Sequence, residues 1–139
     1  MADINPIIRA ALETHLAGTS GLPDIAYENV TYSPTTGQSF IKVAYTPTLR
    51  RPDVIGLNPQ QRYQGIFSLN VYSPEGTGPS ACEAIVKKLL ERFEATTDIT
   101  YNDGSADYTV FISYAERSNA LVDAPWYLIP VDIGWYIYN

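Results

Sequence analysis

Few residues of this chain are of the types that usually break bonds or hold metal ions. Among its 139 residues, His15 is the single histidine and Cys82 is the single cysteine. A hydrolytic triad needs a histidine base beside its nucleophile, and the chain has no Gly-x-Ser-x-Gly turn to expose a serine. A zinc site of the usual type takes three or four such ligands, more than the chain can supply. The sequence therefore predicts no catalytic residue, no metal site and no cofactor site.

One carboxylate offers an alternative. Asp132 lies inside a predicted strand, with Tyr136 on the same face. If another element closed that face, burial would raise the pKa of Asp132 and the residue could act as a general base. The simpler interpretation, which we favour, is a solvent-facing side chain on the outer side of a sheet. A small cytosolic α+β enzyme or ligand-binding domain that uses Asp132 and tyrosines stays as an alternative hypothesis.

The strongest candidate for a contact surface is residues 46–61, which show no regular pattern and which we predict to be a loop. Loops of about 16 residues are uncommon and are often functional. Paired arginines beside apolar side chains are typical of protein contacts. The predicted interface residues are Arg50, Arg51, Asp53, Val54, Ile55 and Leu57. The alternative, that the three apolar side chains fold back onto the domain's own core, stays open.

The sequence also predicts two amphipathic helices. The first is predicted over residues 6–17, with Asn5 as its N-cap and Gly18 just past its end. The second opens at Gly78-Pro79 and carries one continuous apolar stripe. Its members are Cys82, Ile85, Val86, Leu89, Leu90 and Phe93. A single cysteine on such a stripe is typical of a small buried side chain.

Alternating apolar and polar residues predict the strands. They are expected over residues 25–32, 40–45, 62–72, 99–101, 107–114 and 126–138. In the fifth of these, Tyr108, Val110, Ile112 and Tyr114 are expected to share a face. Pro130 in the last strand cannot donate a ladder hydrogen bond, so we predict that this strand lies at an edge or carries a bulge.

The order of elements predicts the fold class. Hairpin-like connections dominate, and each helix has one apolar face that must be covered. We therefore predict a single α+β domain over residues 1–139. Its sheet is expected to be mostly antiparallel, with both helices packed on one face.

Composition limits the partners. The net charge is −6 and the sequence pI is about 4.6, whereas nucleic-acid binding relies on Lys and Arg that neutralise phosphates. No apolar run is long enough to span a membrane. A lone cysteine fits a reducing compartment. We expect no specific nucleic-acid binding, no membrane contact, and synthesis in the cytosol.

A set of short segments, taken in order, resembles the tail terminator (tail completion) proteins of long-tailed bacteriophages. The segments are Tyr27-Glu28-Asn29, Tyr32-Ser33-Pro34, Phe40-Ile41-Lys42-Val43, Gly65, Leu69-Asn70-Val71-Tyr72, Gly76-Thr77-Gly78, Phe93, Trp126 and Pro130-Val131-Asp132-Ile133-Gly134-Trp135. Together they cover most of the chain from residue 26 to 136. Position 27 is tyrosine here, where the family more often has tryptophan.

The resemblance implies a function as well as a fold. It implies an α+β subunit of the virion tail that forms a hexameric ring, caps the tail tube and ends its polymerisation. The implied partners are other copies of the chain, the tube protein and the head–tail connector protein, with DNA passing through the centre. It brings no catalytic residues. Related neck and connector proteins have similar folds, so a neck protein is the alternative within the virion.

Overall fold

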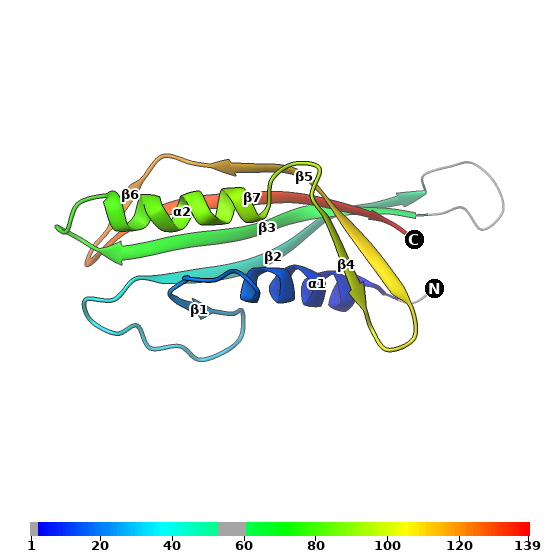
Figure 1. Ribbon diagram of the computed structural model, residues 1–139, viewed down its shortest axis with the longest axis horizontal. Helices are drawn as coiled ribbons and strands as arrows, with labels where there is room; N and C mark the ends of the chain where they lie inside the picture. The colour runs from blue at the N-terminus through cyan, green and yellow to red at the C-terminus, as the bar shows by residue number, and fades with distance from the viewer. Residues whose placement is uncertain (1–2, 53–60) are drawn as a thin grey trace.

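The structure is a computed structural model that describes residues 3–52 and 61–139. Its two helices and seven strands follow one another along the chain (Figure 1). They are α1 (Asn5–Ala17), β1 (Asp24–Ala26), β2 (Phe40–Pro52), β3 (Gln61–Pro74), α2 (Ser80–Arg92), β4 (Asp98–Asn102), β5 (Asp107–Arg117), β6 (Leu121–Asp123) and β7 (Trp126–Tyr138).

All seven strands belong to one sheet. Its order is β1-β2-β3-β7-β5-β4, and β6 also pairs with β7. The pairing of β1 with β2 is parallel and every other pairing is antiparallel. The predicted α+β class with a mostly antiparallel sheet is therefore confirmed.

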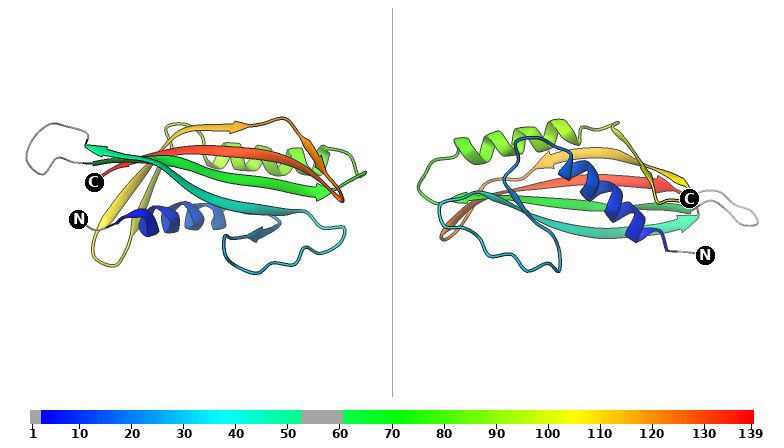
Figure 2. Two further views of the ribbon diagram at one scale, coloured as in Figure 1. Left: turned by 180° about the vertical axis from the view of Figure 1, so that it is seen from behind. Right: turned by 60° about the horizontal axis from the view of Figure 1, so that its bottom comes forward.

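The core lies between one face of the sheet and the two helices. β3 alternates strictly between buried and half-exposed residues, as its sequence pattern predicts. The buried side chains of α1 and α2 join the inward side chains of β2, β3, β5 and β7 in a single cluster. Both helices thus cover the same face, α2 along β3 and β7 and α1 beside β4 (Figures 1 and 2).

The strand predicted over 40–45 is much longer in the structure. β2 continues to Pro52, and β3 starts at Gln61, so half of the predicted loop 46–61 belongs to a strand pair. The register shifts between Pro47 and Leu49, which marks a β-bulge. The prolines hid the strand because they weaken β-propensity, whereas pairing with β3 supplies the backbone hydrogen bonds that propensity does not count.

The prediction of an edge position for the last strand is wrong. β7 lies in the middle of the sheet, with β3 on one side and β5 and β6 on the other. The Pro130 carbonyl accepts a hydrogen bond from Ser118 N, which follows the end of β5. A residue's N and C=O point to the same side of a strand, so the missing N–H of Pro130 faces the break between β5 and β6. Proline therefore costs no ladder bond with β3.

The predicted face of Tyr114 is also wrong. The register of β5 against β7 shifts between Ile112 and Tyr114. The extra residue, Ser113, moves Tyr114 to the outer face, where its ring lies against Gly134. Ala115 takes the inward position opposite Ile133. A one-residue insertion exchanges the two faces of a strand because side chains alternate with a period of two.

Three smaller differences concern element ends. The strand predicted over 25–32 is limited to β1, since residues 27–39 form no strand. α1 starts at Asn5 instead of being capped by it, and the Asn5 side chain donates to Asp3 Oδ1 at 2.7 Å. β6 lies between the strands predicted over residues 107–114 and 126–138, where the sequence predicts no strand.

Candidate assembly surfaces

Part of the predicted interface lies near the end of the β2–β3 strand pair. Arg50 is exposed, and its guanidinium lies 5.4 Å from the ring centroid of Tyr63, its register partner on β3. Arg51 is the next residue of β2 and pairs in register with Arg62. The strand pair extends beyond both helices at this end (Figure 1). Strand structure, not a loop, therefore positions the two arginines.

The other predicted interface residues lie outside the described part of the chain. They are Asp53, Val54, Ile55 and Leu57, which follow directly on β2. Whether their apolar side chains contact a partner or the domain itself stays a prediction.

Asp132 lies on the outer face of β7, opposite Ser68 of β3. It accepts a hydrogen bond of 3.1 Å from the Ser68 hydroxyl. Burial, and after it the charges of Asp132 and Glu116, raise the pKa of nearby Tyr114. Neither helix covers this face, since both pack on the opposite one. The environment matches the simpler interpretation of Asp132, a side chain on the outer surface of a sheet.

The same outer face carries a row of rings and one cation across β5, β7 and β3. Phe111 stacks on Tyr136 with 5.3 Å between ring centroids. The Arg62 guanidinium lies 4.5 Å from the centroid of Tyr136 and donates a 2.9 Å hydrogen bond to the Tyr138 hydroxyl. Gln64 accepts a second bond from Arg62 Nε at 3.0 Å. Aromatic residues and arginine on a partly exposed surface are characteristic of protein interfaces.

A second aromatic group lies at the opposite end of the outer face. Phe40 of β2 stacks on Tyr72 of β3 with 4.6 Å between centroids and an angle of 1° between the rings. Trp126 of β7 meets Phe40 edge-on at 5.1 Å, and Tyr32 from the 27–39 segment lies at 5.3 Å. These rings border an open hollow of about 600 Å³ between the 27–39 segment and the sheet.

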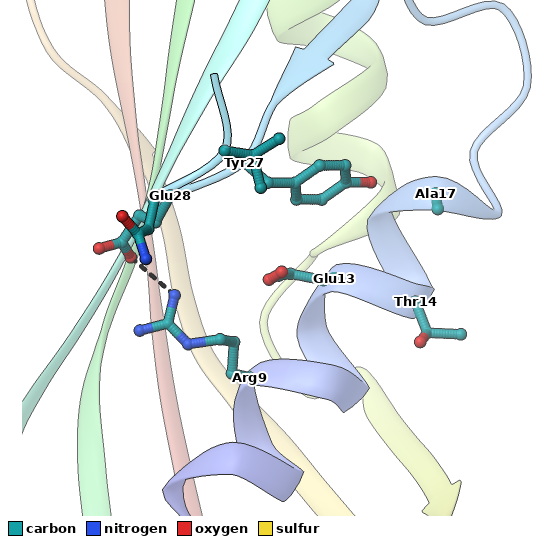
Figure 3. A pocket seen from close by; sticks show the side chains of 8 residues that line it. Arg9, Glu13, Thr14, Ala17, Tyr27 and Glu28 are labelled. Atoms are coloured by element: carbon teal, nitrogen blue, oxygen red, sulfur yellow. Dashed lines mark hydrogen bonds and ion pairs between the residues drawn. The ribbon is translucent and has the colours of Figure 1, made fainter. Parts of the chain in front are cut away.

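Another open hollow, of about 630 Å³, separates α1 from the start of the 27–39 segment (Figure 3). Arg9 on α1 reaches across to Glu28, and its Nη1 lies 2.9 Å from Glu28 Oε1. The same carboxylate oxygen accepts a hydrogen bond from the backbone N–H of Tyr45 on β2. Glu28 thus ties the segment after β1 both to a helix and to the sheet.

The acidic groups of this hollow titrate differently. Burial raises the pKa of Glu13, although the charge of Arg9 opposes the shift. Burial alone would raise the pKa of Glu28, but bonds from the Tyr45 amide and the Arg9 guanidinium outweigh it and lower that pKa. Burial, and then the charge of Glu13, raise the pKa of Tyr27. The surroundings of Glu28 therefore stabilise its ionised form, whereas those of Glu13 destabilise its ionised form.

The described residues include few groups arranged for metal binding or catalysis. Within residues 3–52 and 61–139, no three His, Cys, Asp or Glu side chains are placed to hold a metal ion. In the same part of the chain, no helix has the length and apolar run needed to span a bilayer. Cys82 is buried, and burial raises the pKa of its thiol.

Sequence reasoning missed the residues that form the aromatic row and the Glu28 contact. Alternation in β3 and β7 places Arg62, Tyr136 and Tyr138 on the non-core face, so this signal was available. For Glu28 no such signal exists, because its partners Arg9 and Tyr45 lie far away along the chain.

Comparisons with known proteins bear on these surfaces. The model of a family described as "Phage tail terminator protein" matches residues 7–135. One solved structure aligns with 96% of this chain and 94% of its own at a TM-score of 0.71. With 23% sequence identity, that structure shows a shared fold. None of the curated proteins compared with the sequence matches it.

Proposed function

The chain belongs to the phage tail terminator protein family, and from this premise we propose that it caps the tail tube as a ring of identical subunits. The family match runs from α1 to β7 and is the observation that carries the proposal. Family membership gives the protein a structural, tail-completion role in the virion tail. It also points away from an enzyme, because the family is one of structural proteins.

The proposal has three further parts. The ring contains six copies, ends polymerisation of the tube, and forms the surface on which the head–tail connector protein docks. Its subunits are made in the host cytoplasm and join the tail there. DNA passes through the ring without specific binding, in keeping with a net charge of −6.

The described surfaces support a role carried out by contact. The β2–β3 strand pair extends past the helices and carries Arg50 and Arg51. The outer face of the sheet presents the row formed by Phe111, Tyr136 and Arg62. We assign the end of the strand pair, with the residues that follow Pro52, to contact with the adjacent subunit or the tube.

Electron microscopy of phage particles that lack the protein tests the proposal. Over-long tails are expected, because nothing would end growth of the tube. Finished tails of normal length without heads would contradict tube termination and would instead support a neck or connector protein. Supplying the intact chain should restore tails of normal length.

A further inference from the structure

The edge of the sheet at β2 is only partly covered by another strand. β1 pairs with β2 only at Phe40, Ile41 and Lys42. From Val43 to Pro52, β2 has β3 on one side and, among the described residues, no strand on the other. Such an edge presents backbone N–H and C=O groups that a strand from another molecule can pair with.

The Tyr45 N–H shows which backbone groups point outward. It donates to the Glu28 carboxylate, which belongs to the segment that follows β1, and β1 lies on the side of β2 away from β3. The N–H therefore points away from β3. Tyr45 and its register partner Phe67 are therefore a non-hydrogen-bonded pair. Backbone direction alternates along a strand, so the outward positions between β1 and the register shift after Pro47 are Val43, Tyr45 and Pro47.

Before the register shift, the two outward positions beyond Val43 both lack an available donor. Pro47 has no N–H, and the register shift that follows it interrupts the edge further. The Tyr45 N–H is occupied by Glu28. Proline closes its position permanently, whereas a side-chain carboxylate can be withdrawn. A strand that added to β2 here would have to take the place of Glu28.

The Glu28 contact is built so that it can be released. Its partner Arg9 is on α1, and the two side chains are each 37% exposed. Ion pairs at such exposure contribute little to stability. Glu28 comes two residues after β1, at the start of the 27–39 segment, which forms no strand. Moving this segment away would break few backbone hydrogen bonds of the sheet.

We propose that Glu28 is a releasable cap on the β2 edge, and that its withdrawal opens this edge to a strand of a second copy of the chain. The inference rests on the proposed ring, because the ring supplies the second copy. The cap keeps free subunits from pairing edge to edge, and assembly replaces the Glu28–Tyr45 bond by a backbone bond between subunits. The contact thus suppresses premature association.

Amide hydrogen exchange at Tyr45 tests the cap in the isolated, full-length protein. In dilute solution, Glu28→Ala should speed exchange of the Tyr45 amide by about ten- to a hundredfold, the range expected for loss of a charge-assisted hydrogen bond. Glu28→Gln keeps an acceptor oxygen and should give a smaller increase. At higher concentration, Glu28→Ala should associate by light scattering, and its Tyr45 amide should become protected again.

Glu83→Ala is the matched control. Glu83 also forms an exposed ion pair, with Arg117, but it accepts from no backbone amide among its described contacts. This variant should exchange and elute like the wild-type protein. The proposal is overturned if Glu28→Ala leaves Tyr45 exchange unchanged, or if it associates while Tyr45 stays unprotected at every concentration. These measurements need no phage, so their failure is separate from failure of tube capping in particles.

Discussion

At the scale of single residues, Glu13 is the clearest case of a charge placed in an unfavourable site. Among the described residues, its Oε2 is buried without a hydrogen-bond partner. Burial raises its pKa in the folded protein. A raised folded pKa means that the group destabilises the fold once it ionises. This destabilisation is absent below the unfolded pKa of about 4.3 and appears as pH rises through the folded value.

We therefore predict that Glu13→Gln increases the free energy of unfolding at pH 7, because the amide removes the partly buried charge. The gain should be under about 1 kcal/mol, since the side chain is only partly buried. At pH 4 the gain should be smaller, because Glu13 is then largely protonated in both states. Urea unfolding at the two pH values measures the difference.

Glu94→Gln is the control for Glu13→Gln, because Glu94 is exposed and its substitution removes the same charge. It should change stability by less at pH 7. A Glu13→Gln variant that is less stable than wild type at pH 7, or equally affected at both pH values, would contradict the assignment of a buried charge.

At the scale of elements, the strands were predicted correctly where apolar and polar residues alternate without a break, and incorrectly where a bulge interrupts the alternation. The buried face of β3 and the run of β7 from Trp126 to Tyr138 match the sequence pattern. The bulge after Ile112 reversed the predicted face of Tyr114, and β2 continued beyond the predicted strand through a bulge after Pro47. A bulge is set by the partner strand, so the residues of one strand alone do not reveal it.

The candidate surfaces likewise divide into residues that one stretch of sequence indicates and residues that only strand pairing brings together. Arg50 and Arg51 were identified from their own sequence neighbourhood, and the structure places them on β2. The row of Arg62, Tyr136 and Phe111 depends on the register that joins three strands distant in sequence. Alternation puts these side chains on the outer face, but tertiary pairing determines the register that brings them side by side, and the sequence does not reveal that register.

Both bulges lie next to one row of paired residues that crosses four strands of the sheet. The close packing in this row leads to a prediction about Gly65. Pro47, Gly65, Trp135 and Ile112 are successive register partners on β2, β3, β7 and β5. A Cβ on Gly65 would lie 2.3 Å from the Thr46 carbonyl oxygen and 2.6 Å from the Trp135 ring. Gly65→Ala should therefore lower the free energy of unfolding by about 1–3 kcal/mol, the range for overpacking.

Chemical denaturation measures that loss, and Gly18→Ala is its control. A Cβ on Gly18 would meet chiefly the end of the Arg92 side chain, at 2.9 Å, and the Gly18 φ of −75° suits alanine. This change should alter stability by under about 1 kcal/mol. If Gly65→Ala were as stable as Gly18→Ala, β2 and β3 would not approach as closely as described.

At the scale of the whole molecule, the acidic chain carries its charges unevenly. Arg50, Arg51 and Arg62 gather on the paired strands β2 and β3, whereas Lys87 and Lys88 lie on the exposed side of α2. Helices and inward side chains supply stability on one face, and we propose the strand pair and the outer face as the contact surfaces. A tail-completion subunit needs this separation, because it must stay folded before its partners are present.

The last prediction compares charge reversal at Arg50 and Arg51 with charge reversal at Lys87 and Lys88. Replacing both Arg50 and Arg51 by glutamate should abolish capping, because a reversed charge opposes the contact assigned to this end of the sheet. Replacing both Lys87 and Lys88 by glutamate changes the net charge equally and should leave capping intact. Tail lengths in particles complemented with each variant measure the effect, and circular dichroism checks that both fold. Normal tails with the arginine variant would remove the end of the β2–β3 pair from the contact with the tube or the neighbouring subunit.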